Sequence, residues 1–130
     1  MSFEIRNYDI EDIPAVKQFT DQWIGEGYFS EQELKDIFKL SQGNGMNASY
    51  LAFQGEELAA VRLSLAPGEW VKTMRGLNPK KWGVPDSQVG YFKSLFVAEK
   101  FQRQGPGRGL SQKSLLTLKD MGAQAVVCHC

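Results

Sequence analysis

Apolar side chains recur along the chain with two periods, which predict strands in some segments and helices in others. Residues 3–6 alternate apolar and polar positions, the period of a half-buried strand. Asp9 stands where a helix N-cap is expected, because apolar residues follow at helical spacing over residues 10–24. Ser30 and Glu33 have the spacing of a capping box, so a second helix is expected after Ser30.

The rest of the chain has the pattern of strands joined by one hairpin and one helix. A polar loop is expected at residues 44–47, and two apolar runs flank the turn-forming residues 54–57, which is typical of a β-hairpin. Residues 66–88 have no sustained period and predict a long loop of the kind that often lines a site. The remaining elements are expected at residues 89–98 (strand), 99–109 (glycine-rich turn), 110–121 (helix) and 124–130 (strand).

The expected order of elements is strand, helix, helix, strand, strand, strand, helix, strand. The hairpin must be antiparallel, whereas the last strand, helix and strand form a βαβ unit whose two strands are parallel. This order predicts an α/β fold with a mixed, mostly antiparallel sheet and flanking helices. At 130 residues the chain has the length of one domain, so residues 1–130 are expected to form a single domain.

Charge and composition exclude several classes of partner. The 15 Lys and Arg residues balance the 15 Asp and Glu residues, so no general attraction to nucleic acid or to an anionic membrane is expected. No apolar run approaches the roughly 20 residues of a membrane span, and the N-terminus lacks the pattern of a signal peptide. A cytoplasmic protein is therefore expected.

The segment from Leu95 to Leu110 combines a buried strand, a loop with glycines at alternate positions and the start of a helix. Such a loop brings backbone N–H groups and the positive end of a helix dipole to one point, where an anion can bind. Arg103 and Arg108 add positive charge, and the glycines allow close approach to the backbone. A plain helix cap is the alternative, but a cap does not require Gln102, two arginines and three glycines together.

Two common phosphate-binding patterns do not fit this loop. The Walker pattern is GxxxxGK followed by Ser or Thr, whereas Arg108 and Gly109 follow Gly107 here. The dinucleotide fingerprint GxGxxG belongs to an early βαβ unit, whereas this loop is GxGxG near the C-terminus. One further pattern fits: Gln or Arg, two residues, Gly, one residue, and Gly or Ala, after a strand that ends in Leu-x-Val. Residues 102–107, after Leu95-Phe96-Val97, match it.

With this motif the sequence resembles the GNAT superfamily of N-acetyltransferases, and the order of its elements is similar to that of the family from the first strand to the last. The resemblance implies that the two parallel strands are splayed apart by a bulge in the strand before the loop. It also implies an enzyme that uses acetyl-CoA as co-substrate, without a metal. An amine of a small molecule or protein would accept the acetyl group by direct attack.

The resemblance assigns roles to single residues. The backbone N–H of Leu95 stands where it polarises the thioester carbonyl as an oxyanion donor. Phe96 and Val97 are expected beside the pantetheine arm. Pro106 departs from the pattern, because it has no N–H and so removes one donor from the loop. The pyrophosphate is expected to bind the N–H groups of Arg103, Gln104, Gly105, Gly107 and Arg108, and Gln102 and Gly109 complete the expected cofactor-binding loop.

The acid and base groups are less visible in the sequence. Tyr91 occupies the position where some family members carry a glutamate base, and a tyrosine is no ordinary base at neutral pH. His129 and Glu69 are the remaining base candidates. Other members supply a tyrosine acid from a helix beyond the position of Cys130. A catalytically silent acyl-CoA-binding module and an inactive truncated fragment are therefore the alternative hypotheses.

Cys128-His129-Cys130 and two tryptophans have simpler interpretations. The three residues alternate along one strand, so at most the two cysteines face one site, and neither zinc nor a disulfide is expected. Cys128 is expected to be a small buried hydrophobe. Trp70 and Trp82 are expected to be partly buried under the long loop, with a lining of the acceptor channel as the alternative.

The last strand, residues 124–130, is expected to be an unpaired apolar edge. The family continues with a further helix and two strands, one of which pairs with this strand, whereas the sequence ends at Cys130. An exposed apolar edge is a pairing site. We therefore expect a second subunit, an exchange of elements or an unusual local arrangement to cover it.

Overall fold

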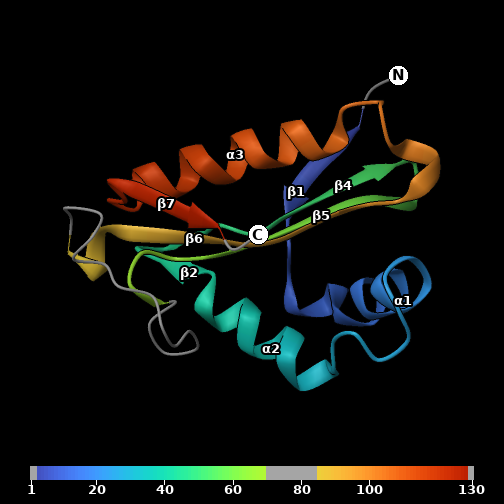
Figure 1. Ribbon diagram of the computed structural model, residues 1–130, viewed down its shortest axis with the longest axis horizontal. Helices are drawn as coiled ribbons and strands as arrows, with labels where there is room; N and C mark the ends of the chain where they lie inside the picture. The colour runs from blue at the N-terminus through green and yellow to red at the C-terminus, as the bar shows by residue number, and fades with distance from the viewer. Residues whose placement is uncertain (1–2, 70–84, 129–130) are drawn as a thin grey trace.

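The computed structural model describes residues 3–69 and 85–128, in which five strands form one sheet with helices on both faces. The sheet and the helices that cover it comprise β1 (Glu4–Asn7), α1 (Ile13–Trp23), α2 (Glu31–Leu40), β4 (Tyr50–Gln54), β5 (Glu57–Leu65), β6 (Val89–Val97), α3 (Pro106–Asp120) and β7 (Ala125–Cys128). The strand order is β1-β4-β5-β6-β7, antiparallel except for the parallel pair β6 and β7. Helices α1 and α2 cover one face, and α3 covers the other (Figure 1). The predicted mixed, mostly antiparallel α/β fold is confirmed.

Both predicted helix caps are present. Asp9 caps the 3-10 turn η1 (Ile10–Asp12) that leads into α1: its carboxylate accepts from the Ile10 N–H at 2.6 Å. Ser30 and Glu33 form the capping box of α2, with both hydrogen bonds at 3.0 Å. Replacing such a cap by alanine costs about 1 kcal/mol. Among residues 3–69 and 85–128, no helix has the length and apolar character needed to cross a membrane.

The central strand β5 is buried on both faces. Val61, Leu63 and Leu65 pack in the core under α1 and α2. Ala60 packs with Leu110 of α3 on the opposite face. Each fully buried aliphatic side chain contributes about 1.5–3 kcal/mol, so the sheet is held between two apolar layers.

The segment expected to be a polar loop at residues 44–47 is instead the tip of a small hairpin. Strands β2 (Gln42–Gly43) and β3 (Met46–Asn47) pair around Asn44-Gly45. Asn44 and Gly45 have φ angles of 52° and 76°, the left-handed values that a two-residue type I′ turn requires. Asn-Gly is the sequence signature of that turn, so the signal was present but the flanking strands are too short to show a period.

Helix α3 begins at Pro106, four residues before the predicted start at Leu110. Gly105 is its N-cap, with φ of 88°, and Pro106 occupies the first helical position, where its fixed φ and missing N–H fit the helix. The glycines that favoured a turn instead allow close packing. A Cβ on Gly107 would lie 3.1 Å from Cγ2 of Val97, and one on Gly109 would lie 3.0 Å from Cδ1 of Ile5.

Candidate functional site

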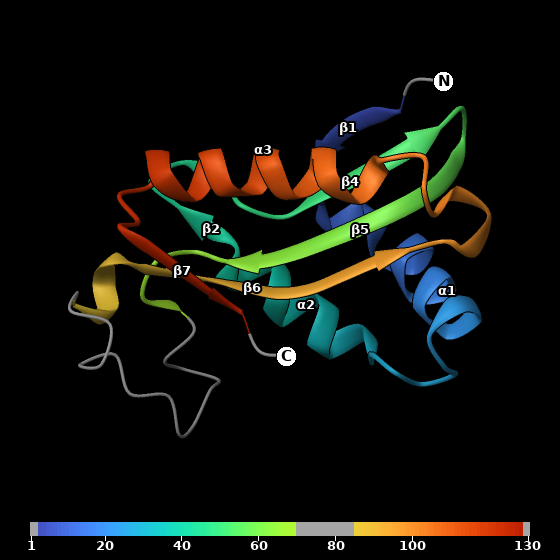
Figure 2. The same cartoon turned by 45° about the horizontal axis from the view of Figure 1, so that its top comes forward.

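Strands β6 and β7 form a fork. They pair in parallel from Val89 with Ala125 to Phe92 with Cys128. Strand β6 continues to Val97, and Figure 2 shows the two strands diverging towards their carboxyl ends. Among the described residues, no strand pairs with the β7-facing edge of β6 beyond Phe92. The splayed parallel pair implied by the family resemblance is therefore present.

The hydrogen-bonding pattern between β5 and β6 determines which backbone groups face the fork. The Ala98 N–H donates to the Ala59 carbonyl at 2.9 Å, and hydrogen-bonded pairs alternate with non-hydrogen-bonded pairs along an antiparallel ladder. The pairs Ala60 with Val97 and Arg62 with Leu95 are therefore non-hydrogen-bonded. Consequently the backbone groups of Leu95 and Val97 point away from β5, towards the open side of the fork.

A β-bulge lies at the same place. Leu63 pairs with Ser94 and Ser64 pairs with Phe92, so Lys93 is one extra residue on β6. A bulge bends its strand and increases the local twist, which separates β6 from β7 beyond Phe92. The family resemblance implied this bulge, whereas the periodicity of the sequence showed only that Lys93-Ser94 interrupts the apolar run.

The loop between β6 and α3 presents unused N–H groups. The 3-10 turn η5 (Glu99–Phe101) comes first, and Arg103 and Gly105 then have positive φ angles of 73° and 88°. The Gly105 and Arg103 N–H groups, together with those of Gly107 and Arg108 in the first turn of α3, have no acceptor among the described residues. Left-handed residues before a helix direct successive N–H groups to one point, which makes an anion site.

One of the predicted donors, the Gln104 N–H, is used within the protein, and so is the N–H of Gly109. The Gln104 N–H donates to the Phe101 carbonyl at 3.2 Å, and the Gly109 N–H makes the first bond of α3, to the Gly105 carbonyl at 3.3 Å. Gln102 uses its side chain: Nε2 donates to the Val97 carbonyl at 3.4 Å. Four backbone donors therefore remain for a ligand, and Pro106 supplies none.

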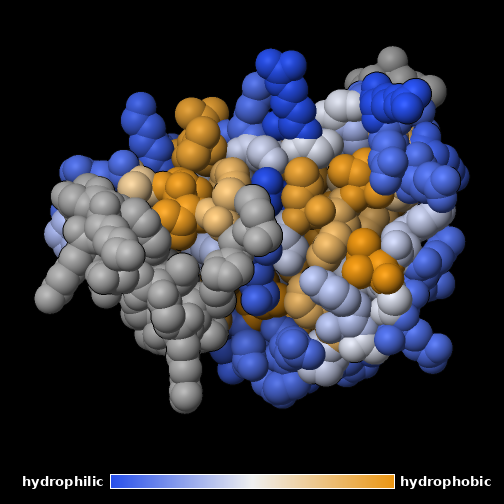
Figure 3. Space-filling view, in the orientation of Figure 1, coloured by the Kyte–Doolittle hydropathy of each residue, from blue (hydrophilic) through white to orange (hydrophobic). Residues whose placement is uncertain are grey.

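The loop and the end of β6 enclose an open hollow of about 360 Å³. Arg103 and Arg108 are exposed at its rim, so their charges are available to an anion. In Figure 3 apolar side chains gather across the middle of the molecule, where β6 runs in Figure 1, and polar side chains surround them. The hollow is lined by Val97, Phe101, Gln102, Arg103, Gly105, Pro106, Gly107 and Arg108.

Phe96 does not share the orientation of its neighbours. Its position in the ladder directs its backbone groups towards Val61 of β5, and its ring packs edge-on against Tyr28 and Phe29, with centroids 5.6 and 6.2 Å apart. Phe96 therefore faces the connection between α1 and α2 rather than the loop. Of the three site residues predicted on β6, Leu95 and Val97 lie beside the loop at Gly107, and Phe96 does not.

The structure separates the base candidate Glu69 from Leu95. The Gly68 N–H donates to the carbonyl of Val89, the first residue of β6, at 3.0 Å, so Glu69 lies near that end of the strand. Leu95 lies six residues further along, about 20 Å at 3.3 Å per residue. One Glu69 carboxylate oxygen is shielded from solvent at that distant end. The other candidate, His129, lies outside the described residues, as do Trp70 and Trp82.

Two further predictions concern side chains near the fork. Tyr91 is buried, and its burial raises the pKa of the phenol, with the Cys128 thiol adding to the effect. This supports the prediction that Tyr91 is no base near neutral pH. Cys128 is exposed, so its predicted role as a buried hydrophobe is wrong: it is at the end of the edge strand, where no element covers it among the described residues.

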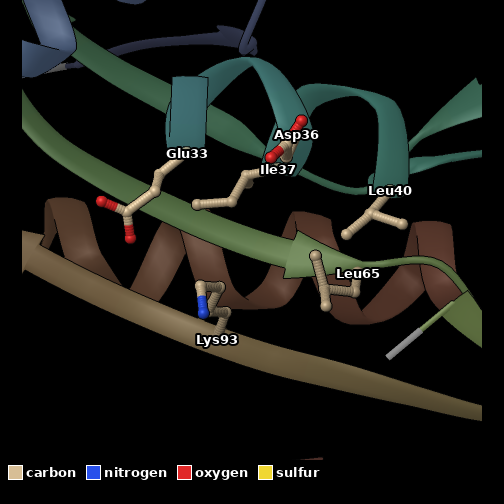
Figure 4. Close-up of a pocket in the computed structure, with 6 residues that line it drawn as sticks. All are labelled: Glu33, Asp36, Ile37, Leu40, Leu65 and Lys93. Atoms are coloured by element: carbon tan, nitrogen blue, oxygen red, sulfur yellow. The ribbon is translucent and has the colours of Figure 1, made fainter. Parts of the chain in front are cut away.

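A cleft of about 170 Å³ opens on the opposite face of the sheet, between α2 and the bulge of β6 (Figure 4). Glu33 and Asp36 come from α2, and the extra residue Lys93 projects from β6 into the same cleft. Ile37, Leu40 and Leu65 form its apolar wall. Sequence reasoning missed this cleft, because only the bulge directs Lys93 to the α2 side.

Comparisons with known proteins agree on the fold. No protein-family model matches the sequence, and no curated protein matches it. Among solved structures, Ard1 from Thermoplasma volcanium is 14% identical, with 98% of this chain and 71% of that chain covered and a TM-score of 0.71. The aminoglycoside N-acetyltransferase AAC(6')-Iy in complex with CoA is 13% identical, with 99% and 77% covered and a TM-score of 0.70.

A third similar structure is the ribosomal-protein-S18-alanine N-acetyltransferase from Escherichia coli. It is 16% identical, with 98% of this chain and 66% of that chain covered and a TM-score of 0.65. At such low identities the likeness concerns the fold. The fold predicted from the resemblance, that of the GNAT acetyltransferases, is confirmed.

Proposed function

We propose that the chain is an acetyl-CoA-dependent N-acetyltransferase that transfers the acetyl group to an amine by direct attack. One observation carries the proposal: the N-terminus of α3 lies directly against the free edge of β6, where Gly107 meets Leu95 and Val97. A long ligand with an anionic part and an amide-containing arm would bind both features at once. Acetyl-CoA has this chemistry.

The pyrophosphate of acetyl-CoA would bind the four unused N–H groups of the loop. Arg103 and Arg108 would add charge from the rim. Hydrogen bonds to a charged group contribute about 1.5–3 kcal/mol each, so four such donors can hold an anion on a protein without net charge.

The pantetheine arm would lie along the free edge of β6, bonded to backbone groups of Val97. The Leu95 N–H would then donate to the thioester carbonyl oxygen. In the transfer the amine nitrogen attacks the carbonyl carbon, and negative charge develops on that oxygen. A fixed N–H donor at this point stabilises the transition state more than the substrate, which is the requirement for catalysis.

The acceptor amine would approach from the α2 face, because α3 covers the other face of the sheet. The cleft at Glu33, Asp36 and Lys93 opens on that side, next to the bulge. The two carboxylates would attract a cationic amine, which must lose a proton before it attacks.

The similar structures support this proposal. AAC(6')-Iy has been solved with CoA and with the bisubstrate analogue CoA-S-monomethyl-acetylneamine. The similar Escherichia coli protein is a ribosomal-protein-S18-alanine N-acetyltransferase. These proteins act on different acceptors, so the likeness supports the acetyl donor and leaves the acceptor open.

The test is calorimetric titration of the protein with acetyl-CoA, followed by detection of released thiol when an amine panel is added. We expect micromolar or tighter binding and thiol release with at least one amine. Binding without thiol release for any amine would favour the silent acyl-CoA-binding module, and absence of binding would contradict the proposal.

A matched pair of glycine variants tests the location of the site. Gly107→Glu places a carboxylate among the loop donors and should abolish binding of acetyl-CoA. Gly25→Glu is the control. Gly25 lies outside the β6–α3 loop, and no atom lies within 4 Å of a Cβ built on it. If circular dichroism shows that both variants are folded, equal affinities of the two for acetyl-CoA would refute the assignment of the loop.

A further inference from the structure

Arg62 is a buried cation without an anionic partner among the described residues. It lies in the middle of β5 and is 8% exposed. Its Nε and Nη2 groups both donate to the Ser111 hydroxyl of α3, at 3.3 and 2.9 Å. The ion pairs within residues 3–69 and 85–128 do not include it. A buried charge that lacks a compensating charge is costly, so a ligand that brings negative charge would stabilise it.

Arg62 lies where β6 and β7 part. Its guanidinium carbon is 4.1 Å from the centroid of the Phe92 ring, and Phe92 forms the last described pair of the β6–β7 ladder, with Cys128. Arg62 also stands directly opposite Leu95 in the β5–β6 register. Opposite residues of neighbouring strands point to the same face of a sheet, so the guanidinium and the Leu95 side chain share the α3 face.

The surroundings of Arg62 keep it charged but poorly solvated. Burial lowers its pKa, and the Cys128 thiol acts in the opposite direction. A guanidinium stays protonated at every pH of biological interest. In such a poorly solvated place a charge interaction is stronger than in water. The guanidinium therefore has an electrostatic effect on whatever occupies the fork.

Acetyl-CoA carries no charge at its thioester end, and full negative charge forms there only during the transfer. The amine attacks the carbonyl carbon and releases a proton to water, and the carbon–sulfur bond breaks with its electron pair remaining on sulfur. The products are the amide, the proton and the CoA thiolate. We propose that Arg62 binds the sulfur of this departing thiolate, an inference that rests on the proposed function.

This role explains why the cation is buried without a carboxylate. A carboxylate partner would neutralise Arg62 before the reaction, whereas an uncompensated guanidinium interacts with charge that exists only in the transition state and product. Such an interaction raises kcat with little effect on the affinity for the neutral thioester. Ser111 and Phe92 hold the guanidinium in place, so it is positioned before the charge forms.

The experiment compares CoA with desulfo-CoA, in which hydrogen replaces the thiol. Both are titrated calorimetrically at pH 7 and pH 9 into the wild-type protein and into Arg62→Met and Arg62→Gln. For the wild type we expect the preference for CoA to increase about tenfold at pH 9, as the thiol ionises beside a cation. In both variants this increase disappears, while desulfo-CoA binds as before and kcat falls about 100-fold.

Three ionisable protein groups lie near the guanidinium, so the pH comparison must account for them. They are the Cys128 thiol of β7, the Tyr50 phenol of β4, which stands opposite Arg62, and the Tyr91 phenol of β6, whose pKa is raised by burial. Cys128→Ala should retain the tenfold increase. Arg62→Met leaves an apolar side chain of similar length, a change that is often neutral for stability, and Arg62→Gln replaces it if it fails to fold.

The outcomes distinguish this inference from the proposed function. If desulfo-CoA binds and the pH-dependent preference persists in the Arg62 variants, Arg62 has only a structural role and the inference is wrong. If the preference is lost in Cys128→Ala, the protein thiol was its source and the inference is also wrong. If neither ligand binds the wild type, the proposed function itself fails.

Discussion

The hydroxyl oxygens of Ser64 and Ser114 lie 2.7 Å apart and join α3 to the central strand β5. Both side chains are fully buried. The Ser114 hydroxyl also donates to the Ala48 carbonyl at 2.7 Å, and the Ser64 N–H donates to the Ser49 hydroxyl at 2.9 Å. Helix α3 is thus held by polar contacts as well as by Leu110 and Leu118 of its apolar face.

Ser114→Ala should destabilise the protein. The substitution leaves the buried Ala48 carbonyl and Ser64 hydroxyl without their partner, which costs about 1–3 kcal/mol. Urea denaturation measures the change in the free energy of unfolding. Gln112→Ala, an exposed position on the same helix, is the control and should change it by less than about 0.5 kcal/mol. Equal effects at the two positions would contradict the importance of this network.

Arg108→Ala should weaken binding of CoA mainly at low ionic strength. Arg108 is exposed at the rim of the loop, so its attraction to phosphate is screened when the Debye length falls from about 30 Å to about 8 Å between 0.01 and 0.15 M salt. Titration with CoA at the two salt concentrations measures the effect. Lys113→Ala, further along α3, is the control. A loss of affinity that does not depend on salt would indicate packing rather than charge.

Pro106→Ala should strengthen binding of CoA. Alanine restores the N–H that proline lacks at the first position of α3, and one additional hydrogen bond to phosphate is worth about 1.5 kcal/mol, or about tenfold in Kd. The melting temperature should fall slightly, because proline restricts the unfolded chain. Affinity equal to or below that of the wild type would show that this N–H does not face the ligand.

Tyr8 should make the protein less stable at alkaline pH. Its phenol is fully buried and donates to the Leu34 carbonyl at 2.8 Å, and burial raises its pKa well above the ordinary value. The folded state therefore holds the proton more tightly than the unfolded state. This contribution is complete below about pH 10, the unfolded value, and is lost as the pH rises above it.

Urea denaturation of the wild type and of Tyr8→Phe at pH 8 and pH 11 tests this dependence. At pH 8 the variant should be less stable by about 1 kcal/mol, since a hydrogen bond is lost. Between pH 8 and pH 11 it should lose less stability than the wild type. Tyr28→Phe is the control, because Tyr28 is 49% exposed. A steeper decline for Tyr8→Phe than for the wild type would reverse the assigned sign.

The edge strand β7 should mediate association at high concentration. Among the described strands it is the last in the sheet, and Ala125 and Val126 line an apolar hollow with Leu115 of α3, which is 49% exposed. Light scattering at micromolar to millimolar concentration should show a dimer or larger species, and Val126→Lys should reduce it, since an edge charge opposes pairing. A stable monomer throughout this range would contradict the prediction.

Local chemistry made several features predictable from the sequence. Asp9 and Ser30 satisfy helix donors within a few residues of themselves, so their roles depend little on the rest of the fold. The order of strands and helices follows from the period of apolar positions, and residues 95–107 carry the spacing of the loop. The sequence predicted the start of α3 four residues too late, because glycines before a helix normally indicate a turn. In the structure Gly107 lies within the helix, where it allows close packing against Val97.

The sequence by itself thus determined the main strands and helices, their order and a loop with the spacing of a phosphate-binding motif, because those depend on short-range periodicity and spacing. The family resemblance pointed to the backbone of Leu95 and Val97, but only the tertiary structure placed these groups at the fork, through the register of β5 with β6 and the bulge at Lys93. It also decided that Glu69 is far from Leu95 and that Arg62 reaches the fork from the middle of β5. These relationships join residues distant in the chain, and no local pattern encodes them.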